Sequence, residues 1–179
     1  MAQSVELIFD PATEAALRVN WDRLADNGFP SSRHVRPDPD HRPHLTLYAA
    51  DRIAASADER LPKLFGDLDL PVRIGALMIF GPRRGQVILV RQVIPSVDLL
   101  TLQQQVASVC RADPRGQFGA GNWSPHITLA RRMGLHQLGA AVEVLGRSAA
   151  ELTGVVRHCR RWDGARRAVL WSTEPPTGH

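Results

Sequence analysis

The sequence has little cysteine, almost no lysine and no long apolar run, and two of these shortages exclude whole classes of protein. Only Cys110 and Cys159 occur, and their wide separation supports neither a disulfide framework nor a CxxC pair for metal or redox chemistry. No apolar run approaches the roughly 20 residues needed to cross a bilayer. Residues 1–10 lack the basic start and long apolar stretch of a secretory signal. We therefore expect a cytoplasmic protein that has no membrane partner.

Lys63 is the only lysine, so the basic residues are almost all arginine. Arginine suits planar, bidentate contacts with phosphate, and the net charge of +4 is compatible with a phosphate-bearing partner. Genome composition also replaces lysine by arginine, so both explanations stay open. At 179 residues, of which 44% are hydrophobic, the chain is expected to form one domain over 1–179 with a disordered tail at about 173–179.

The two halves of the chain are predicted to share one order of elements: a loop, a strand that starts near a histidine, a helix and two strands. In the first half the predicted strands are 5–9, 44–49, 72–80 and 86–93, and a loop is predicted at 29–43. The predicted helices are 11–26 and 54–67, and the second of them is interrupted near Pro62. The second half has predicted strands at 124–130, 152–162 and 166–171, helices at 97–112 and 135–145, and a loop at 113–122. The helix at 97–112 has Val97, Leu100, Val106 and Val109 among its apolar positions. This repeat predicts an α+β fold with two pseudo-symmetric lobes.

One pentapeptide occurs twice, as PHLTL at 43–47 and as PHITL at 125–129. On a strand alternate side chains share a face, so each histidine and the threonine two residues later face one side while the aliphatic residues face the other. A lone histidine followed by threonine on a strand is usually structural. Duplication at matching places in two similar halves favours a site in which two imidazoles and two hydroxyls converge.

These groups match what the cleavage of a phosphodiester requires. An attacking oxygen must lose a proton and the leaving oxygen must gain one, and two histidines with an ordinary pKa of about 6.5 can divide these roles. The hydroxyls of Thr46 and Thr128 would donate hydrogen bonds to the non-bridging phosphate oxygens, where charge concentrates. We expect His126 to be the base and His44 the acid, although only the orientation of the substrate distinguishes them. No cluster of carboxylates or close pair of histidines implies a metal, and no other cofactor is expected.

At these residues the sequence resembles the 2H phosphoesterase superfamily, which is defined by two His-x-Thr/Ser-x motifs, and within it the 2′-5′ RNA ligase-like and cyclic nucleotide phosphodiesterase branch. The similar order of elements extends from Val5 to about Trp171. The resemblance implies a two-lobed duplication, each lobe an antiparallel sheet with helices outside, and motifs that face across a central cleft. It also implies hydrolysis of 2′,3′-cyclic phosphates, at RNA or nucleotide ends, to 2′-phosphates.

Members of the family often place a phosphate-contacting Arg or Tyr five residues after the second histidine, and that position is Arg131 here. Simple strand alternation directs Arg132, not Arg131, to the face of His126. A phosphate contact by Arg131 therefore requires the strand to end or to bulge before it.

Two aromatic residues are weaker candidates for contact with the substrate. Tyr48 lies at an even offset from His44 and would reach the cleft, the alternative being an ordinary strand aromatic in the core or at an edge. Trp123 precedes the second motif and would stack on a base, unless it belongs to the core.

Two groups of arginines have open roles. The loop at 29–43 contains several basic residues that would guide a nucleic-acid strand: Arg33, His34, Arg36, His41 and Arg42. The alternative is an ordinary solvated loop. Arg157, Arg160 and Arg161 lie on a late strand, where a solvated face or protection of a sheet edge is expected.

The residues leave three functions open: hydrolysis of a cyclic phosphate, binding of RNA ends without turnover, and ligation of RNA through a 2′-5′ linkage. Hydrolysis by two histidines predicts activity in the presence of a chelator and a bell-shaped dependence of rate on pH. Since the sequence has no obvious heptad or large exposed apolar stripe, a monomer is expected.

Overall fold

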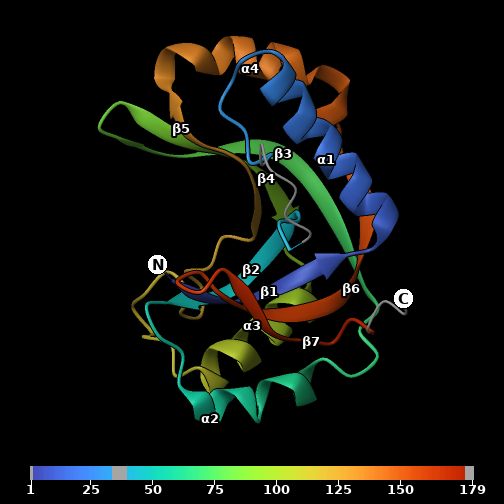
Figure 1. The fold of residues 1–179 in the computed structure, drawn as a ribbon, viewed down its shortest axis with the longest axis vertical. Helices are drawn as coiled ribbons and strands as arrows, with labels where there is room; N and C mark the ends of the chain where they lie inside the picture. The colour runs from blue at the N-terminus through green and yellow to red at the C-terminus, as the bar shows by residue number, and fades with distance from the viewer. Residues whose placement is uncertain (1, 34–39, 176–179) are drawn as a thin grey trace.

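The computed structural model describes residues 2–33 and 40–175, and its elements follow the predicted order (Figure 1). The strands are β1 Gln3–Phe9, β2 His44–Ala50, β3 Leu70–Arg83, β4 Gln86–Ile94, β5 His126–Gly134, β6 Leu152–Asp163 and β7 Ala168–Ser172. The helices are α1 Pro11–Asp26, α2 Ala55–Asp58, α3 Val97–Val109 and α4 Leu138–Leu145, with 3-10 turns η1 Leu61–Leu64, η2 Leu135–Gln137 and η3 Gly146–Ala149. None of the helices in this part of the chain is both long and apolar enough to span a membrane.

The strands form one antiparallel sheet with the order β2-β1-β6-β3-β4-β5, and β7 pairs with β6. The long strand β3 joins two lobes, because its first residues pair with β6 and the remainder pairs with β4. We call β1, β2, β6 and β7 with α2 and α3 the β1 lobe, and β3, β4 and β5 with α1 and α4 the β4 lobe (Figure 1). The end strands β2 and β5 contact one another, so the curvature of the sheet brings the two histidine motifs together.

Each lobe has its own hydrophobic core, and the helices cross between the lobes. Leu24 of α1 packs with Leu129 of β5 and Leu145 of α4 in the core of the β4 lobe. Val106 of α3 packs with Leu45 of β2 in the core of the β1 lobe. The helix that follows β1 therefore covers the β4 lobe, and the helix that follows β4 covers the β1 lobe (Figure 1).

The start of α1 follows the sequence prediction. Asp10 accepts hydrogen bonds from the backbone N–H groups of Ala12 and Thr13 at 3.0 and 3.1 Å, and Pro11 takes the first helical position. The same carboxylate accepts from the N–H of Val155 in β6 at 3.0 Å. One residue thus begins the helix and fastens it to the neighbouring strand.

Two predicted helices differ in the structure. The helix expected over 54–67 is only one turn of α2 followed by the 3-10 turn η1, since Pro62 cannot donate a backbone hydrogen bond. Val97 and Leu100 of α3 are exposed at 80% and 39%, while Leu102 and Gln103 are buried. Helix α3 is oriented by the amide of Gln103, which donates to the backbone oxygens of Leu47 and Phe118 at 3.4 and 2.9 Å.

The late arginines and the start of the tail also differ from expectation. Arg160 and Arg161 are buried, because β6 is an inner strand of the sheet, and only Arg157 lies on an exposed face. Thr173 exchanges two hydrogen bonds of 2.9 Å with the backbone of Cys159, so the chain is still fixed where the tail was expected to begin. Residues 176–179 lie outside the described part of the chain.

Candidate active site

Both motif strands contain a β-bulge three residues after the histidine. In β2, Thr46 pairs with Glu6 and Tyr48 with Val5, which leaves Leu47 as the extra residue. The aliphatic residues of both motifs are buried, as the alternation predicts, and both histidines and both threonines are partly exposed.

In β5 the extra residue is Leu129, because Thr128 pairs with Val90 and Ala130 with the next residue, Leu89. The bulge changes the face of the residues that follow it, as far as a second shift of register between Ala130 and Met133, so the odd offset of Arg131 from His126 becomes equivalent to an even one. It explains why Leu129 and Ala130 are both buried, and it returns the next residue, Arg131, to the face of His126.

The two imidazoles have the same orientation. Nδ1 of His44 lies 2.7 Å from the backbone oxygen of Arg42, and Nδ1 of His126 lies 2.7 Å from that of Ser124. A carbonyl oxygen can only accept, so Nδ1 carries a proton in both rings and Nε2 is the atom left for a substrate.

Two tryptophans fix the backbone of the motifs. Trp123 donates from Nε1 to the backbone oxygen of Thr46 at 3.1 Å, and Trp21 donates to that of Thr128 at 3.0 Å. Trp123 also packs against the core of the β1 lobe. Its contacts thus support the alternative in which Trp123 positions the first motif and belongs to the core.

A buried carboxylate lies beside His44. Oε1 of Glu6 is 3.7 Å from Nε2 of His44 and accepts from the hydroxyl of Ser4 at 2.6 Å, and Oε2 accepts from Nε and Nη2 of Arg160 at 2.9 and 2.8 Å. Burial raises the pKa of the Glu6 carboxyl, but the positive charges of His44 and Arg160 and the hydrogen bonds outweigh it, so the net pKa lies below its ordinary value. The lowered pKa favours the carboxylate form of Glu6, so its negative charge faces the imidazole of His44.

His126 has a different environment. The edge of the Phe80 ring contacts its imidazole, with ring centroids 4.7 Å apart. Burial is the largest influence on the pKa of His126 and lowers it, the bond to Ser124 raises it, and the charges of Arg131 and His44 lower it further. The net pKa lies below the ordinary value, which favours the neutral imidazole at neutral pH.

The remaining site candidates, Arg131 and Tyr48, differ in their exposure and contacts. Arg131 is exposed, and its charge acts on His126, in agreement with the face assigned to it by the bulge. Tyr48 pairs with the buried Val5, contacts the ring of Phe118 at 5.4 Å and packs against the core. These contacts favour a core role for Tyr48 rather than contact with the substrate.

The described part of the 29–43 loop does not present a free basic lip. Arg33 pairs with Asp26 at 2.7 Å, and Arg42 pairs with Glu14 and Glu174, each at 2.7 Å. The ring of His41 stacks on Trp21 with a centroid separation of 5.1 Å. His34 and Arg36 lie outside the described residues.

Sequence reasoning missed Glu6 and the pairing of Glu6 with Arg160. A carboxylate inside the otherwise apolar strand VELIF was the signal that could have identified Glu6, because a buried charge requires a partner. Its partner lies 154 residues away in the chain and no local pattern points to it.

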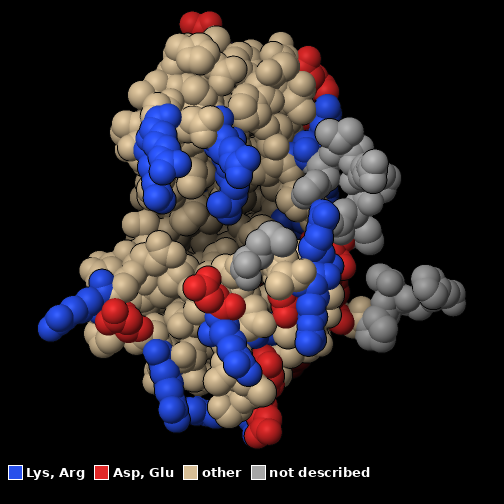
Figure 2. Space-filling model, turned by 60° about the vertical axis from the view of Figure 1, so that its left-hand side comes forward, with Lys and Arg blue, Asp and Glu red and all other residues tan. Residues whose placement is uncertain are grey.

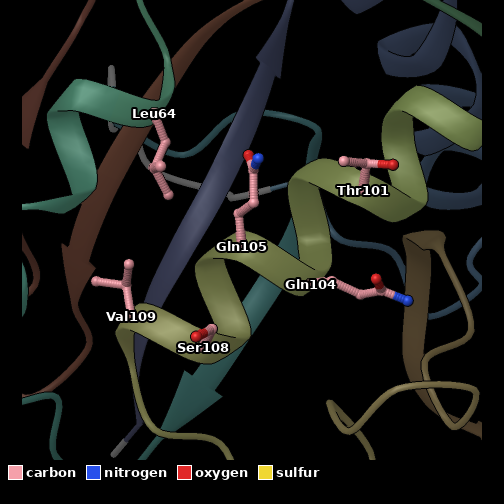
Figure 3. Close-up of a pocket in the computed structure, with 6 residues that line it drawn as sticks. All are labelled: Leu64, Thr101, Gln104, Gln105, Ser108 and Val109. Atoms are coloured by element: carbon pink, nitrogen blue, oxygen red, sulfur yellow. The ribbon is translucent and has the colours of Figure 1, made fainter.

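Figure 2 shows a hollow between the upper and lower parts of the molecule, with basic side chains above it. In the described residues no group of three or more His, Cys, Asp or Glu side chains is placed to hold a metal ion. A separate pocket between η1 and α3 (Figure 3) is lined by residues outside the predicted site: Leu64, Thr101, Gln104, Gln105, Ser108 and Val109.

Comparisons with known proteins agree with this fold. A family model described as the 2′-5′ RNA ligase superfamily matches residues 11–166. The solved structure of TT0787 of Thermus thermophilus is 16% identical, with 96% of each chain covered and a TM-score of 0.59. E. coli LigT complexed with NADP+ is 18% identical over 95% of this chain and 94% of its own, with a TM-score of 0.52. Kluyveromyces marxianus Usb1 with uridine monophosphate is 11% identical over 94% and 96%, with a TM-score of 0.53. No curated protein matches the chain.

Proposed function

Because the chain belongs to the 2′-5′ RNA ligase superfamily, we propose that it hydrolyses 2′,3′-cyclic phosphates at the ends of RNA or nucleotides to 2′-phosphates. The observation that supports this proposal is the matched presentation of His44 and His126. Each ring uses Nδ1 to donate to the backbone, so Nε2 is the atom that can exchange a proton with a substrate, and the two motif strands contact one another. A site that divides proton transfer between two imidazoles requires this arrangement.

In the proposed reaction a water molecule attacks the phosphorus of the cyclic phosphate. Nε2 of His126 accepts a proton from the water as the new phosphorus–oxygen bond forms. The bond from phosphorus to O3′ breaks, and Nε2 of His44 donates its proton to the leaving O3′. The products are a 2′-phosphate and a 3′-hydroxyl, and two proton transfers through solvent restore the starting state of the histidines.

The surroundings of the two histidines support this division of roles. Glu6 places a negative charge 3.7 Å from Nε2 of His44, the group proposed as the acid. The lowered pKa of His126 favours the neutral form that a base requires. Thr46, Thr128 and Arg131 would donate hydrogen bonds to the non-bridging oxygens as negative charge develops on them. No step in this scheme requires a metal ion.

The alternatives make different predictions. A module that binds RNA ends without turnover would retain its affinity when either histidine is replaced, because arginines supply the binding energy. A 2′-5′ RNA ligase would join two RNA ends with the same groups, and the supply of substrates decides the direction of the reaction.

The test is incubation of the protein, with a chelator present, with an RNA oligonucleotide that ends in a 2′,3′-cyclic phosphate. We expect the wild type to produce the 2′-phosphate, and His44→Ala and His126→Ala to lose this activity. His136→Ala is the matched control, since His136 is exposed in η2 outside the site. Loss of activity with the chelator would exclude the metal-free scheme, and binding without any turnover would favour the RNA-binding module.

A further inference from the structure

The strands of the β4 lobe carry arginine and no acidic residue. From Leu70 to Val97 and from Pro114 to Val142 the sequence contains no Asp or Glu. Of the arginines in these strands and in the turn between β3 and β4, Arg91 is buried and Arg73 pairs with Glu151. The others are exposed and, within the described residues, have no ion pair with a carboxylate: Arg83, Arg84, Arg131 and Arg132. This surface is therefore a strong attractor for phosphate.

The strand register directs part of this surface toward the site. Phe80 pairs with Ile88 and Arg83 pairs with Gln86, and alternate residues of β4 share a face. That face of β4 also carries Gln92, the partner of His126. The contact between the rings of Phe80 and His126 independently places Phe80 on the face of the histidine.

The same face thus continues outward from His126, past Phe80, to the turn of the β3–β4 hairpin. Arg83 and Gln86 form the next pair beyond Phe80 and Ile88, two residues or about 7 Å further along β4. The register shifts here, so three residues of β3 cover this step. Arg84 follows in the turn and is exposed. We call Phe80, Arg83 and Arg84 the hairpin surface.

We propose that the hairpin surface binds the single-stranded RNA that leads to the cyclic end, so that the preferred substrate is an RNA end rather than a free cyclic mononucleotide. This inference rests on the proposed function. Single strands bind proteins through cationic contacts with phosphates and through stacking of bases on aromatic rings. The hairpin surface offers two exposed arginines and one aromatic ring that contacts the imidazole of the candidate catalytic histidine.

The hairpin between β6 and β7 provides a matched control. It also has two adjacent exposed arginines in its turn, and Arg167 has a φ of 54°, close to the 53° of Arg84. Arg166, however, lies 3.9 Å from the carboxylate of Asp163. Replacement of either pair by glutamine removes the same charge from the end of a β-hairpin, although Arg83 is the last residue of β3 and both Arg166 and Arg167 lie in the turn.

The test compares the wild type with Arg83→Gln/Arg84→Gln and with Arg166→Gln/Arg167→Gln. We measure kcat/KM for a cyclic mononucleotide and for a ten-nucleotide RNA with a 2′,3′-cyclic end. We also measure the binding of the fluorescent 2′-phosphate product by anisotropy at several salt concentrations. The wild type should prefer the oligonucleotide, and the hairpin variant should lose about tenfold on the oligonucleotide alone. The salt slope of its binding should fall by about 1.4, since each phosphate contact contributes about 0.7 on single strands.

The outcomes separate this inference from the proposed function. A wild type that turns over neither substrate contradicts the proposed function, whereas the anisotropy comparison still decides whether the hairpin surface binds RNA. Equal losses in the two double variants would overturn the inference and indicate a general effect of charge. An unchanged preference for the oligonucleotide in the hairpin variant would overturn it as well.

Discussion

The motifs at His44 and His126 have the same backbone construction and different electrostatic surroundings. Each has a histidine bonded to the second carbonyl before it, a threonine whose carbonyl accepts from a tryptophan, and a bulge at the next residue. His44, however, lies beside the anion of Glu6, and His126 lies beside Phe80 and the cation of Arg131. Duplicated backbone geometry thus positions two equivalent groups, and their neighbours give them different electrostatic surroundings.

The residue five positions after each histidine shows the same asymmetry. In β5 this residue is Arg131, and in β2 it is Ala49. Near the first motif the cation comes from another strand: it is the buried Arg160 of β6, which pairs with Glu6. A local motif therefore does not carry the whole of either half of the site.

The largest loss of activity is expected when both histidines are removed together. If they act in one step, His44→Ala/His126→Ala should be about as slow as either single variant, each losing about 10²- to 10⁴-fold in kcat. Single-turnover hydrolysis of the cyclic phosphate measures this. Losses that multiply in the double variant would mean that the histidines act independently.

The second effect concerns stability in the β1 lobe. Arg160→Met leaves the buried Glu6 without its main partner and should lower the free energy of unfolding by about 3 to 5 kcal/mol. Arg157→Met is the matched control, because its pair with Asp69 is exposed and should contribute at most about 1 kcal/mol. Urea unfolding at neutral pH distinguishes the two variants.

The loss of unfolding free energy in Arg160→Met should depend on pH and should be smaller in acid. The pKa of Glu6 is lower in the folded protein, so its contribution to stability is present above the unfolded pKa and is lost as the pH falls through the folded value. The difference in stability between the wild type and Arg160→Met should therefore shrink in acid. A constant difference down to low pH would contradict the ionised state of Glu6.

A third variant, Arg131→Gln, tests the second motif. Loss of its contact with the phosphate should lower kcat/KM by about 10- to 100-fold. Loss of its charge should raise the pKa of His126 toward the ordinary value, so the acidic limb of the pH–rate profile should move to higher pH. Arg132→Gln, at the adjacent position, is the control and should leave both quantities nearly unchanged.

The last variant, Glu6→Gln, tests the surroundings of the first motif. It keeps the size of the side chain and removes the negative charge 3.7 Å from Nε2 of His44. The single-turnover rate of hydrolysis should fall about threefold to tenfold, because the anion that faces the proposed acid is gone. The acidic limb of the pH–rate profile, which we assign to His126, should stay in place, because Glu6 is not among the groups that act on the pKa of His126. Movement of this limb in Glu6→Gln would contradict the assignment.

Much of the fold was predictable because its signals are local. The cap at Asp10, the hairpin around Gly85 and the alternation in both motifs depend on residues within one turn or one strand. Local patterns failed at the helix predicted over 54–67 and at the exposed Val97, where contacts with other elements decide the outcome.

The pattern of neighbouring residues was enough to identify the two histidine motifs, the burial of their aliphatic residues and the family that they resemble. The folded structure was needed to show that Arg131 rather than Arg132 shares the face of His126, that Tyr48 and Trp123 pack against the core, and that Glu6 lies beside His44. These two kinds of feature differ in how far apart in the chain the interacting residues lie. Alternation along a strand is fixed by neighbouring residues, whereas a bulge, a buried ion pair and the pKa of a histidine depend on partners that the fold brings from distant parts of the chain.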